Sequence, residues 1–327
     1  MVHSVVRFNL VEPGATPASL GARYRAAVEM AAYADEHGVD TVQTEEHHGA
    51  ANGWLPSPFA FAGAVFGATR RIAVTVSAII GPLYDPLRLA EDIAVLDLLS
   101  GGRLITVAGI GYRPEEYEQL GAEWGRRGKL QDELLETLLK AWTGEPFVFR
   151  GRTVRVTPRP YTQPHPMLLV GGSSKAAARR AARLGLPFFP SAHLPELRAY
   201  YEQRCAELGT QGFCMMPAAR TPLLHLSEDP ERAWATYGEH LLHEARTYAS
   251  WQSKDIRSAV CSTAATVSEL RAEGVYRILT PEQCVELAAE PDAQSLVLHP
   301  LCGGMPVAEG RESLRLFAER VLPRLGG

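Results

Sequence analysis

Two acids and two histidines follow one short apolar run and are the strongest candidates for chemistry in this sequence. Residues 39–44 are predicted to form a strand, and Glu45, Glu46, His47 and His48 come directly after it. Because side chains alternate along an extended chain, Glu45 and His47 share one side and Glu46 and His48 the other. Imidazole titrates near neutrality and adjacent carboxylates can fix its tautomer, so the segment suits general acid–base catalysis. An isolated histidine pair can also be merely solvated or packed, so its surroundings must decide.

A glycine- and serine-rich turn is the second candidate site. Gly171, Gly172, Ser173 and Ser174 lie between a predicted strand, residues 167–170, and a predicted helix. Exposed N–H groups, two hydroxyls and the positive end of a helix dipole suit a phosphate. A plain glycine turn with a serine N-cap explains the same residues without a ligand. The pattern is neither a P-loop nor the dinucleotide-binding GxGxxG fingerprint.

A third candidate lies where the predicted strand at residues 104–108 ends. Gly109 and Gly111 remove side chains there, which would let a flat ring approach the backbone closely. Two glycines one residue apart are weak evidence taken alone, since glycines also serve tight turns.

Several other functions are disfavoured by residue type and spacing. His240 and His243 are three apart and outside an HExxH frame, so no metal site is expected. No lysine ends a predicted strand and no GxSxG elbow is present, which disfavours Schiff-base and serine-nucleophile chemistry. The net charge of -4 gives no electrostatic case for nucleic acid or an anionic membrane. Five widely spaced cysteines and the absence of a signal peptide or an apolar span predict a cytoplasmic protein.

The elements that must position these residues alternate regularly between strand and helix. Apolar periodicity predicts strands at residues 4–10, 39–44, 72–80, 104–108, 167–170, 187–190, 213–226 and 295–299, separated by helices. Eight such repeats with right-handed crossovers predict a (β/α)8 TIM barrel, formed by residues 1–327 as one domain. The candidate residues then follow the carboxyl ends of strands, where this fold places chemistry.

Two segments depart from the alternation. Residues 147–156 read as a hairpin turned at Arg150 and Gly151, an excursion from the main sheet. Residues 228–290 form a long insertion before the last strand, and its polar part from Ser253 to Val267 is expected to form a mobile lid. An apolar substrate cavity is expected from side chains near Phe147, Met215, Met216 and Trp251.

The chain resembles the bacterial luciferase-like family of flavin-dependent monooxygenases and related deazaflavin enzymes. The resemblance covers nearly the whole length. It rests on EEHHG at 45–49, DPLRLAEDIAVLDLLSGGRL at 85–104, GYRPEEYEQLG at 111–121, VGGSSKAAARRAARLGLPF at 170–188 and LHPLCGGMP at 298–306.

The resemblance implies a dimeric (β/α)8 enzyme that acts on an apolar small molecule. It implies reduced FMN, supplied by a separate flavin reductase, that reacts with dioxygen to give a C4a-hydroperoxide. His47 matches the histidine that assists this chemistry, with Glu46 and His48 as orienting neighbours or, for His48, a dimer contact. Ser77 and Ala78 match a non-proline cis peptide under the flavin ring, and Ser173 and Ser174 match the phosphate contacts.

Two positions depart from the luciferase pattern. Ile110 stands where luciferases carry a phosphate-binding arginine, so either Arg113 replaces it or the cofactor is held differently. Gly109 stands where the luciferase catalytic subunit has a cysteine near the flavin. Two alternatives therefore stay open beside the FMN monooxygenase: a deazaflavin-dependent oxidoreductase that transfers hydride, and a non-catalytic flavin-binding partner subunit.

Overall fold

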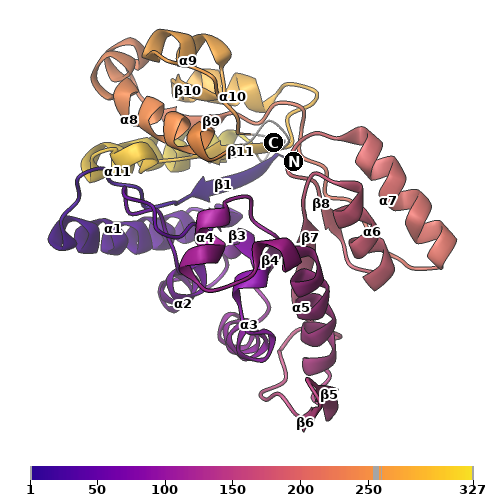
Figure 1. Cartoon of the computed structure of the whole chain (residues 1–327). Helices are drawn as coiled ribbons and strands as arrows, with labels where there is room; N and C mark the ends of the chain where they lie inside the picture. Colours follow the sequence, from indigo (N-terminus) through magenta and orange to yellow (C-terminus); the bar gives the residue numbers. More distant parts are fainter. Residues whose placement is uncertain (1, 253–257, 259, 326–327) are drawn as a thin grey trace. The chain divides into compact units, whose positions relative to one another are not determined.

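The computed structural model describes residues 2–252, 258 and 260–325. They form two compact units. Figure 1 labels the helices and strands of the chain. Unit 1 comprises Met1–Pro56, Ala68–Ile72 and Pro217–Gly327, and unit 2 comprises Ser57–Gly67 and Ala73–Met216. The organisation as one domain stays a prediction.

Five parallel strands form the sheet of unit 1, in the order β10-β9-β11-β1-β2. Their bounds are β1 His3–Arg7, β2 Thr41–Thr44, β9 Leu223–Leu226, β10 Tyr276–Leu279 and β11 Ser295–Leu298. In register, Val5 of β1 lies beside Val297 of β11, and Val6 beside Val42 of β2. Every residue of β9 is buried, which fits a strand of a parallel sheet covered on both faces.

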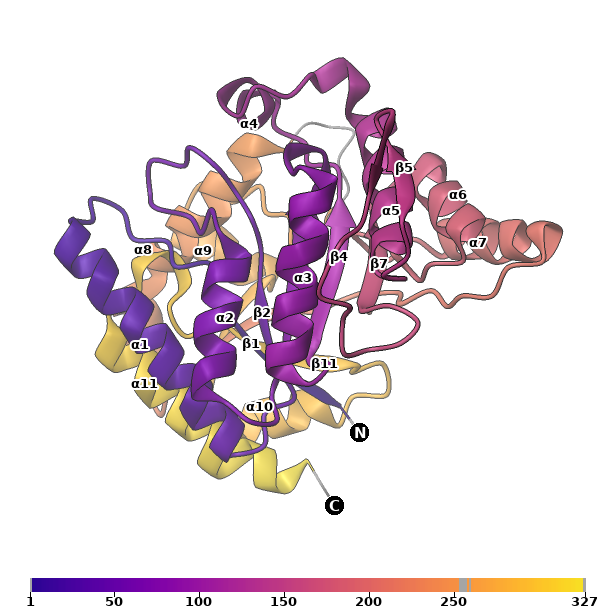
Figure 2. The same ribbon diagram turned by 90° about the horizontal axis from the view of Figure 1, so that it is seen from below.

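Helices pack on this sheet through apolar faces. They are α1 Pro17–Glu36, α8 Pro230–Trp251, α9 Val267–Glu273, α10 Pro281–Ala288 and α11 Val307–Leu316. One buried cluster joins Leu241 of α8, Leu270 of α9, Tyr276 of β10 and Val297 of β11. Helix α1 lies beside α11 (Figure 2). Shorter helical turns are η3 Cys302–Gly304, the π-helical η4 Phe317–Val321 and η5 Leu322–Arg324.

Unit 2 carries four parallel strands in the order β3-β4-β7-β8. Their bounds are β3 Ala73–Ile80, β4 Leu104–Gly109, β7 Met167–Gly171 and β8 Phe188–Phe189. The helices are α2 Pro58–Ala68, α3 Pro86–Ser100, α4 Pro114–Gln119, α5 Arg127–Ala141, α6 Lys175–Leu184 and α7 Pro195–Leu208, with the turns η1 Gly81–Leu83 and η2 Trp124–Arg126. The predicted apolar face of α5 is buried at Leu134, Leu135 and Leu138.

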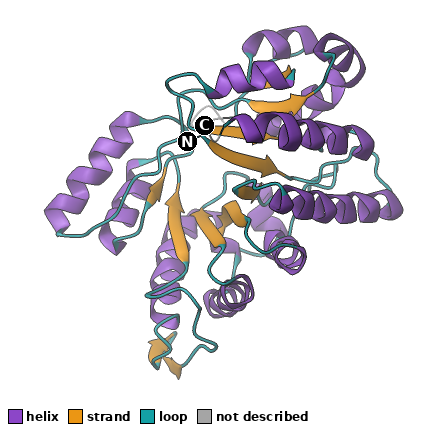
Figure 3. Ribbon diagram, turned by 180° about the vertical axis from the view of Figure 1, so that it is seen from behind, coloured by secondary structure: helices purple, strands orange, loops and turns teal. Residues whose placement is uncertain are grey.

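The predicted hairpin is confirmed. Strands β5 Phe147–Phe149 and β6 Arg152–Val154 pair antiparallel in a two-stranded sheet of their own (Figure 3). The two turn residues have positive φ, 47° at Arg150 and 78° at Gly151, as a two-residue hairpin turn requires.

Two details of the predicted element order are wrong. The strand expected at residues 213–226 is only β9, because Cys214 makes a single bridge to Phe188 and the intervening residues do not pair. The insertion at 228–290 contributes a further parallel strand, β10, together with α8, α9 and α10. Residues 253–257 and 259 of the expected lid lie outside the described residues. Among the helices that the structure describes, none is both long and apolar enough to cross a membrane.

Candidate functional site

The segment after β2 is anchored by a buried ion pair. Arg7, the last residue of β1, donates two hydrogen bonds to the carboxylate of Glu45, from Nε at 3.1 Å and from Nη2 at 2.5 Å. Both side chains are almost fully buried. The forked guanidinium fixes the direction of the carboxylate, so Glu45 sets where the next residues leave the strand.

A second buried carboxylate, Glu244 of α8, lies against the other side of Arg7. It accepts hydrogen bonds from Arg7 Nη1 at 3.2 Å, from the backbone N–H of Gly303 at 3.0 Å, and from the thiol of Cys302 at 3.3 Å. His299 Nε2 lies 3.0 Å from the same carboxylate. These contacts tie β1, α8 and the segment after β11 into one buried polar cluster, which we call the Glu244 cluster.

The charges in the Glu244 cluster stabilise one another. Burial alone would raise the pKa of Glu244, but His299 and Arg7 hold it well below its ordinary value. Burial opposes the charge of Arg7, yet Glu45 and Glu244 raise the pKa of its guanidinium. His225 of β9 is also buried, and burial together with the nearby His299 lowers its pKa to about 4. His225 is therefore neutral at pH 7.

The remaining members of the EEHHG segment have different surroundings. Glu46 Oε1 lies 2.8 Å from His48 Nε2, which agrees with the side-chain alternation expected after a strand. The backbone N–H of His47 donates to the carbonyl of Leu55 at 3.1 Å, so the loop returns to the segment that it left. His47 is 6% exposed.

Three aromatic side chains surround the His47 ring, and we call the four rings the aromatic cluster. Ring centroids lie 5.3 Å from His47 to Trp54, 6.2 Å to Tyr248 and 4.7 Å to Trp251. Trp54 stacks on Tyr248 at 5.9 Å. Glu244, Tyr248 and Trp251 are spaced by four and three residues on α8, so one helix face carries both the Glu244 cluster and the aromatic cluster.

Each histidine of the α8 pair has a hydrogen-bond partner of its own. His240 Nδ1 lies 3.1 Å from the carbonyl oxygen of Gly303, and His243 Nε2 lies 3.1 Å from Asn52 Nδ2. Potential ligand atoms of Glu244, His299 and Cys302 do lie within 4.8 Å of one another. Both carboxylate oxygens of Glu244 are already hydrogen-bonded and Arg7 holds a positive charge beside them, so this trio is better explained as a salt-bridged core.

Unit 2 carries the predicted flavin-ring segment. The peptide bond between Ser77 and Ala78 is cis, as the resemblance implied. The register between β3 and β4 shifts between Ser77 and Ile79. A Cβ on Gly109 would lie 3.3 Å from the Ala78 Cβ, and one on Gly111 would lie 2.8 Å from Ile80 Cγ2. The two glycines therefore let β4 approach the end of β3 closely.

The glycine–serine turn joins β7 to α6. A Cβ on Gly171 would lie 2.9 Å from Val107 Cγ1, so this glycine is needed for packing against β4. Ser174 is the N-cap of α6, and its hydroxyl accepts a hydrogen bond from the Ala177 N–H at 3.3 Å. The first turn of α6 contains no acidic residue, and Ser173 is partly exposed beside it. The turn is a plain N-capped helix start that also fits a phosphate.

Arg113 has a partner of its own. Its guanidinium Nη1 lies 3.1 Å from Oε1 of the buried Glu116. An arginine paired in this way offers less positive charge to a phosphate than a free one, so its assignment as a phosphate contact stays a proposal. The backbone carbonyl of Ile110 accepts a hydrogen bond from the Tyr117 hydroxyl at 2.5 Å.

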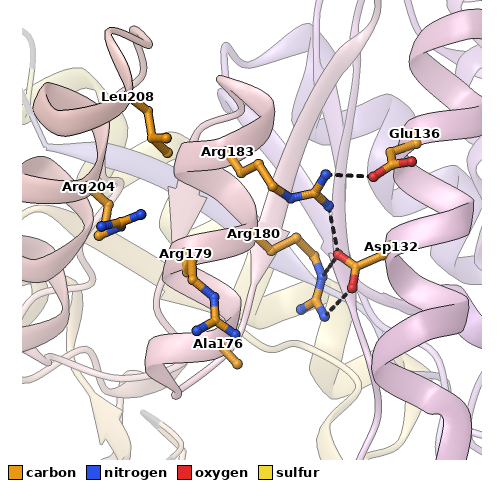
Figure 4. A pocket seen from close by; sticks show the side chains of 8 residues that line it. All are labelled: Asp132, Glu136, Ala176, Arg179, Arg180, Arg183, Arg204 and Leu208. Carbon is orange, nitrogen blue, oxygen red and sulfur yellow. Dashed lines mark hydrogen bonds and ion pairs between the residues drawn. The ribbon is translucent and has the colours of Figure 1, made fainter.

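A surface hollow of about 540 Å³ lies elsewhere in unit 2, between α5, α6 and α7 (Figure 4). It is lined by Asp132, Glu136, Ala176, Arg179, Arg180, Arg183, Arg204 and Leu208. Asp132 pairs with Arg180 and Arg183, and Glu136 with Arg183 (Figure 4). Four arginines line the hollow against two acids, so positive charge is in excess among its lining side chains, and none of the predicted site residues lines it.

Sequence reasoning missed the residues that hold the EEHHG segment in place. Arg7 interrupts an apolar strand, and Glu244 lies on the apolar face of α8 beside Leu241 and Ala245. A charge inside a buried pattern signals a buried pair, since such charges are otherwise expensive to bury. Apart from the size of its side chain, nothing in the sequence marks Trp54 as a residue of the site.

Parallel strands alternating with helices, with a histidine pair after β2 and a capped glycine–serine turn after β7, define a (β/α)8 enzyme with its polar residues at strand ends. Residues 4–296 match the sequence profile of the luciferase-like monooxygenases. The chain belongs to this family.

Individual relatives agree with the family assignment. The chain is 29% identical over 141 residues to an FMNH(2)-dependent dimethylsulfone monooxygenase of Pseudomonas putida, covering 41% of this chain and 39% of that protein. The curated relatives that it matches are thus covered over half of their length or less.

Solved structures match over almost the whole chain and confirm the predicted (β/α)8 fold class. The monooxygenase RslO1 of Streptomyces bottropensis is 26% identical, with a TM-score of 0.78 and 99% of each chain covered. The oxygenating constituent of 3,6-diketocamphane monooxygenase from Pseudomonas putida, solved with FMN, is 17% identical, with a TM-score of 0.72 and 99% of each chain covered.

Proposed function

We propose that this chain is the oxygenase of a two-component monooxygenase that uses reduced FMN and dioxygen to oxygenate an apolar organic substrate. The observation that carries the proposal is the placement of His47 after β2, buried among three aromatic rings and adjacent to a segment fixed by Arg7 and Glu45. The family assignment and an FMNH(2)-dependent relative support the cofactor. A flavin reductase and a homodimer belong to the same proposal.

His47 is the acid–base or hydrogen-bonding group in this proposal. Its position is set by the Leu55 carbonyl and by ring contacts, so its imidazole can hold or release a proton without moving. Glu46 and His48 pair with each other and orient the loop. The aromatic neighbours exclude water from His47, which strengthens any hydrogen bond that the imidazole makes.

In unit 2, the cofactor roles fall to residues that the resemblance singled out. Ser77 and Ala78 would contact the flavin ring, Gly109 would leave room for it, and Arg113 would assist at the phosphate. Gly171, Gly172, Ser173 and Ser174 would hold the phosphate. Their fit rests on the open first turn of α6, which has no acid to repel an anion. Reduced FMN, when bound, would supply the electrons that activate dioxygen.

The proposal is tested by adding reduced FMN and reduced deazaflavin separately to anaerobic protein and measuring both affinities. Dioxygen is then admitted while the absorbance spectrum is followed. We expect tight FMN binding and the transient spectrum of a flavin C4a-hydroperoxide. Binding of deazaflavin alone, with no reaction with dioxygen, would instead establish a hydride-transferring oxidoreductase. FMN binding with no oxygenated species and no substrate turnover would indicate a non-catalytic subunit.

A further inference from the structure

Two buried tryptophans of this chain differ in one respect. Trp142 is 1% exposed, and its indole N–H donates a hydrogen bond to the Ala90 carbonyl at 3.1 Å. Trp54 is 2% exposed, and its indole Nε1 has no hydrogen-bond partner among the described residues. A buried indole N–H normally finds an acceptor, because leaving it unpaired costs free energy. Trp142 shows the usual solution, and Trp54 lacks it.

The unpaired donor lies in the aromatic cluster, beside the proposed catalytic histidine. The Trp54 ring centroid is 5.3 Å from that of His47 and 5.0 Å from that of Trp251. Buried polar groups left unpaired are few in native proteins, and a catalytic role or a bound water or ion is a common reason for one. A ligand that brings an acceptor atom to this N–H would satisfy the donor.

A second unpaired atom lies two residues away in the same loop. Asn52 donates from Nδ2 to His243 Nε2 at 3.1 Å, while its Oδ1 has no partner among the described residues. Burial lowers the pKa of His243, so its imidazole is neutral at pH 7 and can accept that bond. The loop therefore presents an unpaired donor and an unpaired acceptor close together in the sequence.

We propose that the Trp54 indole N–H donates a hydrogen bond to a neutral oxygen of the substrate, and that the substrate is a planar apolar compound carrying a carbonyl group. The rings of the aromatic cluster suit a flat apolar body. The indole N–H is an uncharged donor and burying an unpaired anion is expensive, so a neutral carbonyl oxygen fits it better than a carboxylate or phosphate. Trp54 is thereby a specificity-determining residue.

This inference rests on the proposed function only in calling the ligand a substrate. The test measures binding without flavin or dioxygen, so the failure of one proposal is seen separately from the failure of the other. The probes are 2-acetylnaphthalene and 2-isopropenylnaphthalene, which have nearly the same shape but carry C=O and C=CH2 respectively. Their dissociation constants are measured by equilibrium dialysis on the full chain.

The wild-type protein should bind the ketone about three- to tenfold more tightly than the alkene, the usual effect of one neutral hydrogen bond. Trp54→Phe keeps an aromatic ring but removes the N–H, so it should bring this ratio to about one. Trp142→Phe is the matched control, and it should keep the ratio while lowering stability, because it loses the bond to Ala90. Trp54→Phe should also lower the denaturation midpoint, because it removes buried ring volume, but it breaks no hydrogen bond within the described residues.

A direct readout comes from protein labelled with 15N-tryptophan. The indole signal that is missing in Trp54→Phe belongs to Trp54, and its proton should shift downfield with the ketone and stay in place with the alkene. Equal affinities for the two probes in the wild-type protein, no binding of either, or a ratio that survives Trp54→Phe would each overturn the proposal.

Discussion

The segment after β2 and the turn after β7 are built in opposite ways. After β2, side chains far apart in sequence form a buried network of charges, with Arg7 between Glu45 and Glu244. After β7, the turn is held mainly by its backbone: a glycine packs against Val107 and a serine caps α6. A site held by buried charges depends on protonation and on single side chains, whereas a site held by backbone depends on chain geometry and tolerates pH.

The largest expected effect is a loss of turnover without a loss of FMN affinity. His47→Ala should lower turnover by about 10²- to 10⁴-fold, the usual contribution of a general acid or base. The affinity for reduced FMN should stay nearly the same, because its proposed phosphate contacts are backbone and hydroxyl groups of unit 2. Turnover is measured on a substrate that the wild-type protein oxygenates, and FMN affinity by anaerobic titration.

His37→Ala is the matched control for that experiment, since His37 is an exposed histidine at the end of α1. It should leave both quantities unchanged. Unchanged turnover in His47→Ala would remove the catalytic assignment.

The second-largest expected effect comes from removing the carboxylate of Glu244, which lies at the centre of the Glu244 cluster. Glu244→Gln leaves Arg7 and His299 without their shared carboxylate and should lower the free energy of unfolding by about 3–5 kcal/mol, as for other broken buried ion pairs. Glu239→Gln, on the exposed face of the same helix, should change it by less than about 0.5 kcal/mol. Urea denaturation at pH 7 measures both. Equal midpoints for the two variants would show that the Glu244 cluster does not hold unit 1 together.

The third prediction concerns how the free energy of unfolding depends on pH through the buried His225. The pKa of His225 is lowered to about 4 in the folded state, against about 6.5 when unfolded. The unfolded chain then binds the extra proton, so stability falls as the pH drops below about 6.5 and the loss levels off below about 4. Between pH 7.5 and 5.0 this one group should lower the free energy of unfolding by about 2 kcal/mol.

The variant His225→Leu isolates that contribution. It should lose about 2 kcal/mol less than the wild-type protein over the same pH interval, in denaturation curves recorded at both pH values. An identical pH dependence in the two proteins would mean that His225 is not held neutral by the fold.

The smallest expected effect concerns the backbone-built turn. Replacing both Ser173 and Ser174 with alanine should weaken FMN binding about tenfold, roughly 1.4 kcal/mol, because two hydroxyl contacts to a phosphate are lost while the backbone N–H groups remain. Riboflavin, which lacks the phosphate, should bind as before.

Because Ser174 also caps α6, a second N-cap serves as the control. Thr280→Ala removes the cap of α10 in unit 1 and should lower stability by about 1 kcal/mol without changing FMN affinity. Equal losses of FMN and riboflavin affinity in the serine variant would count against a phosphate site at this turn.

Most of the helices and strands could be predicted from patterns within short stretches of the sequence. Helix α3 was predictable because Asp85, Pro86 and Gly101 mark its two ends within one short stretch of sequence. The EEHHG segment was recognisable because its titratable residues are contiguous. Strand β10 was missed because it has four residues and pairs with β9, some fifty positions earlier, so nothing local identifies it. Cys214 lies in an apolar run that looks like a strand but forms only one bridge.

The Glu244 cluster could not be predicted, for the same reason. Arg7 and Glu244 are 237 residues apart, and Glu244 and His299 are 55 apart. Only the folded sheet brings them together. Their individual signals, a charge within an apolar strand and an acid on an apolar helix face, indicate burial but do not identify the partner.

Gly303 has no room for any other residue. A Cβ there would lie only 1.8 Å from the His240 carbonyl oxygen of α8, and its φ of 56° already disfavours side chains. The same residue gives its N–H to Glu244. In a library that samples every amino acid at every position, position 303 should therefore tolerate glycine alone, although it lies some sixty residues from the helix that it constrains.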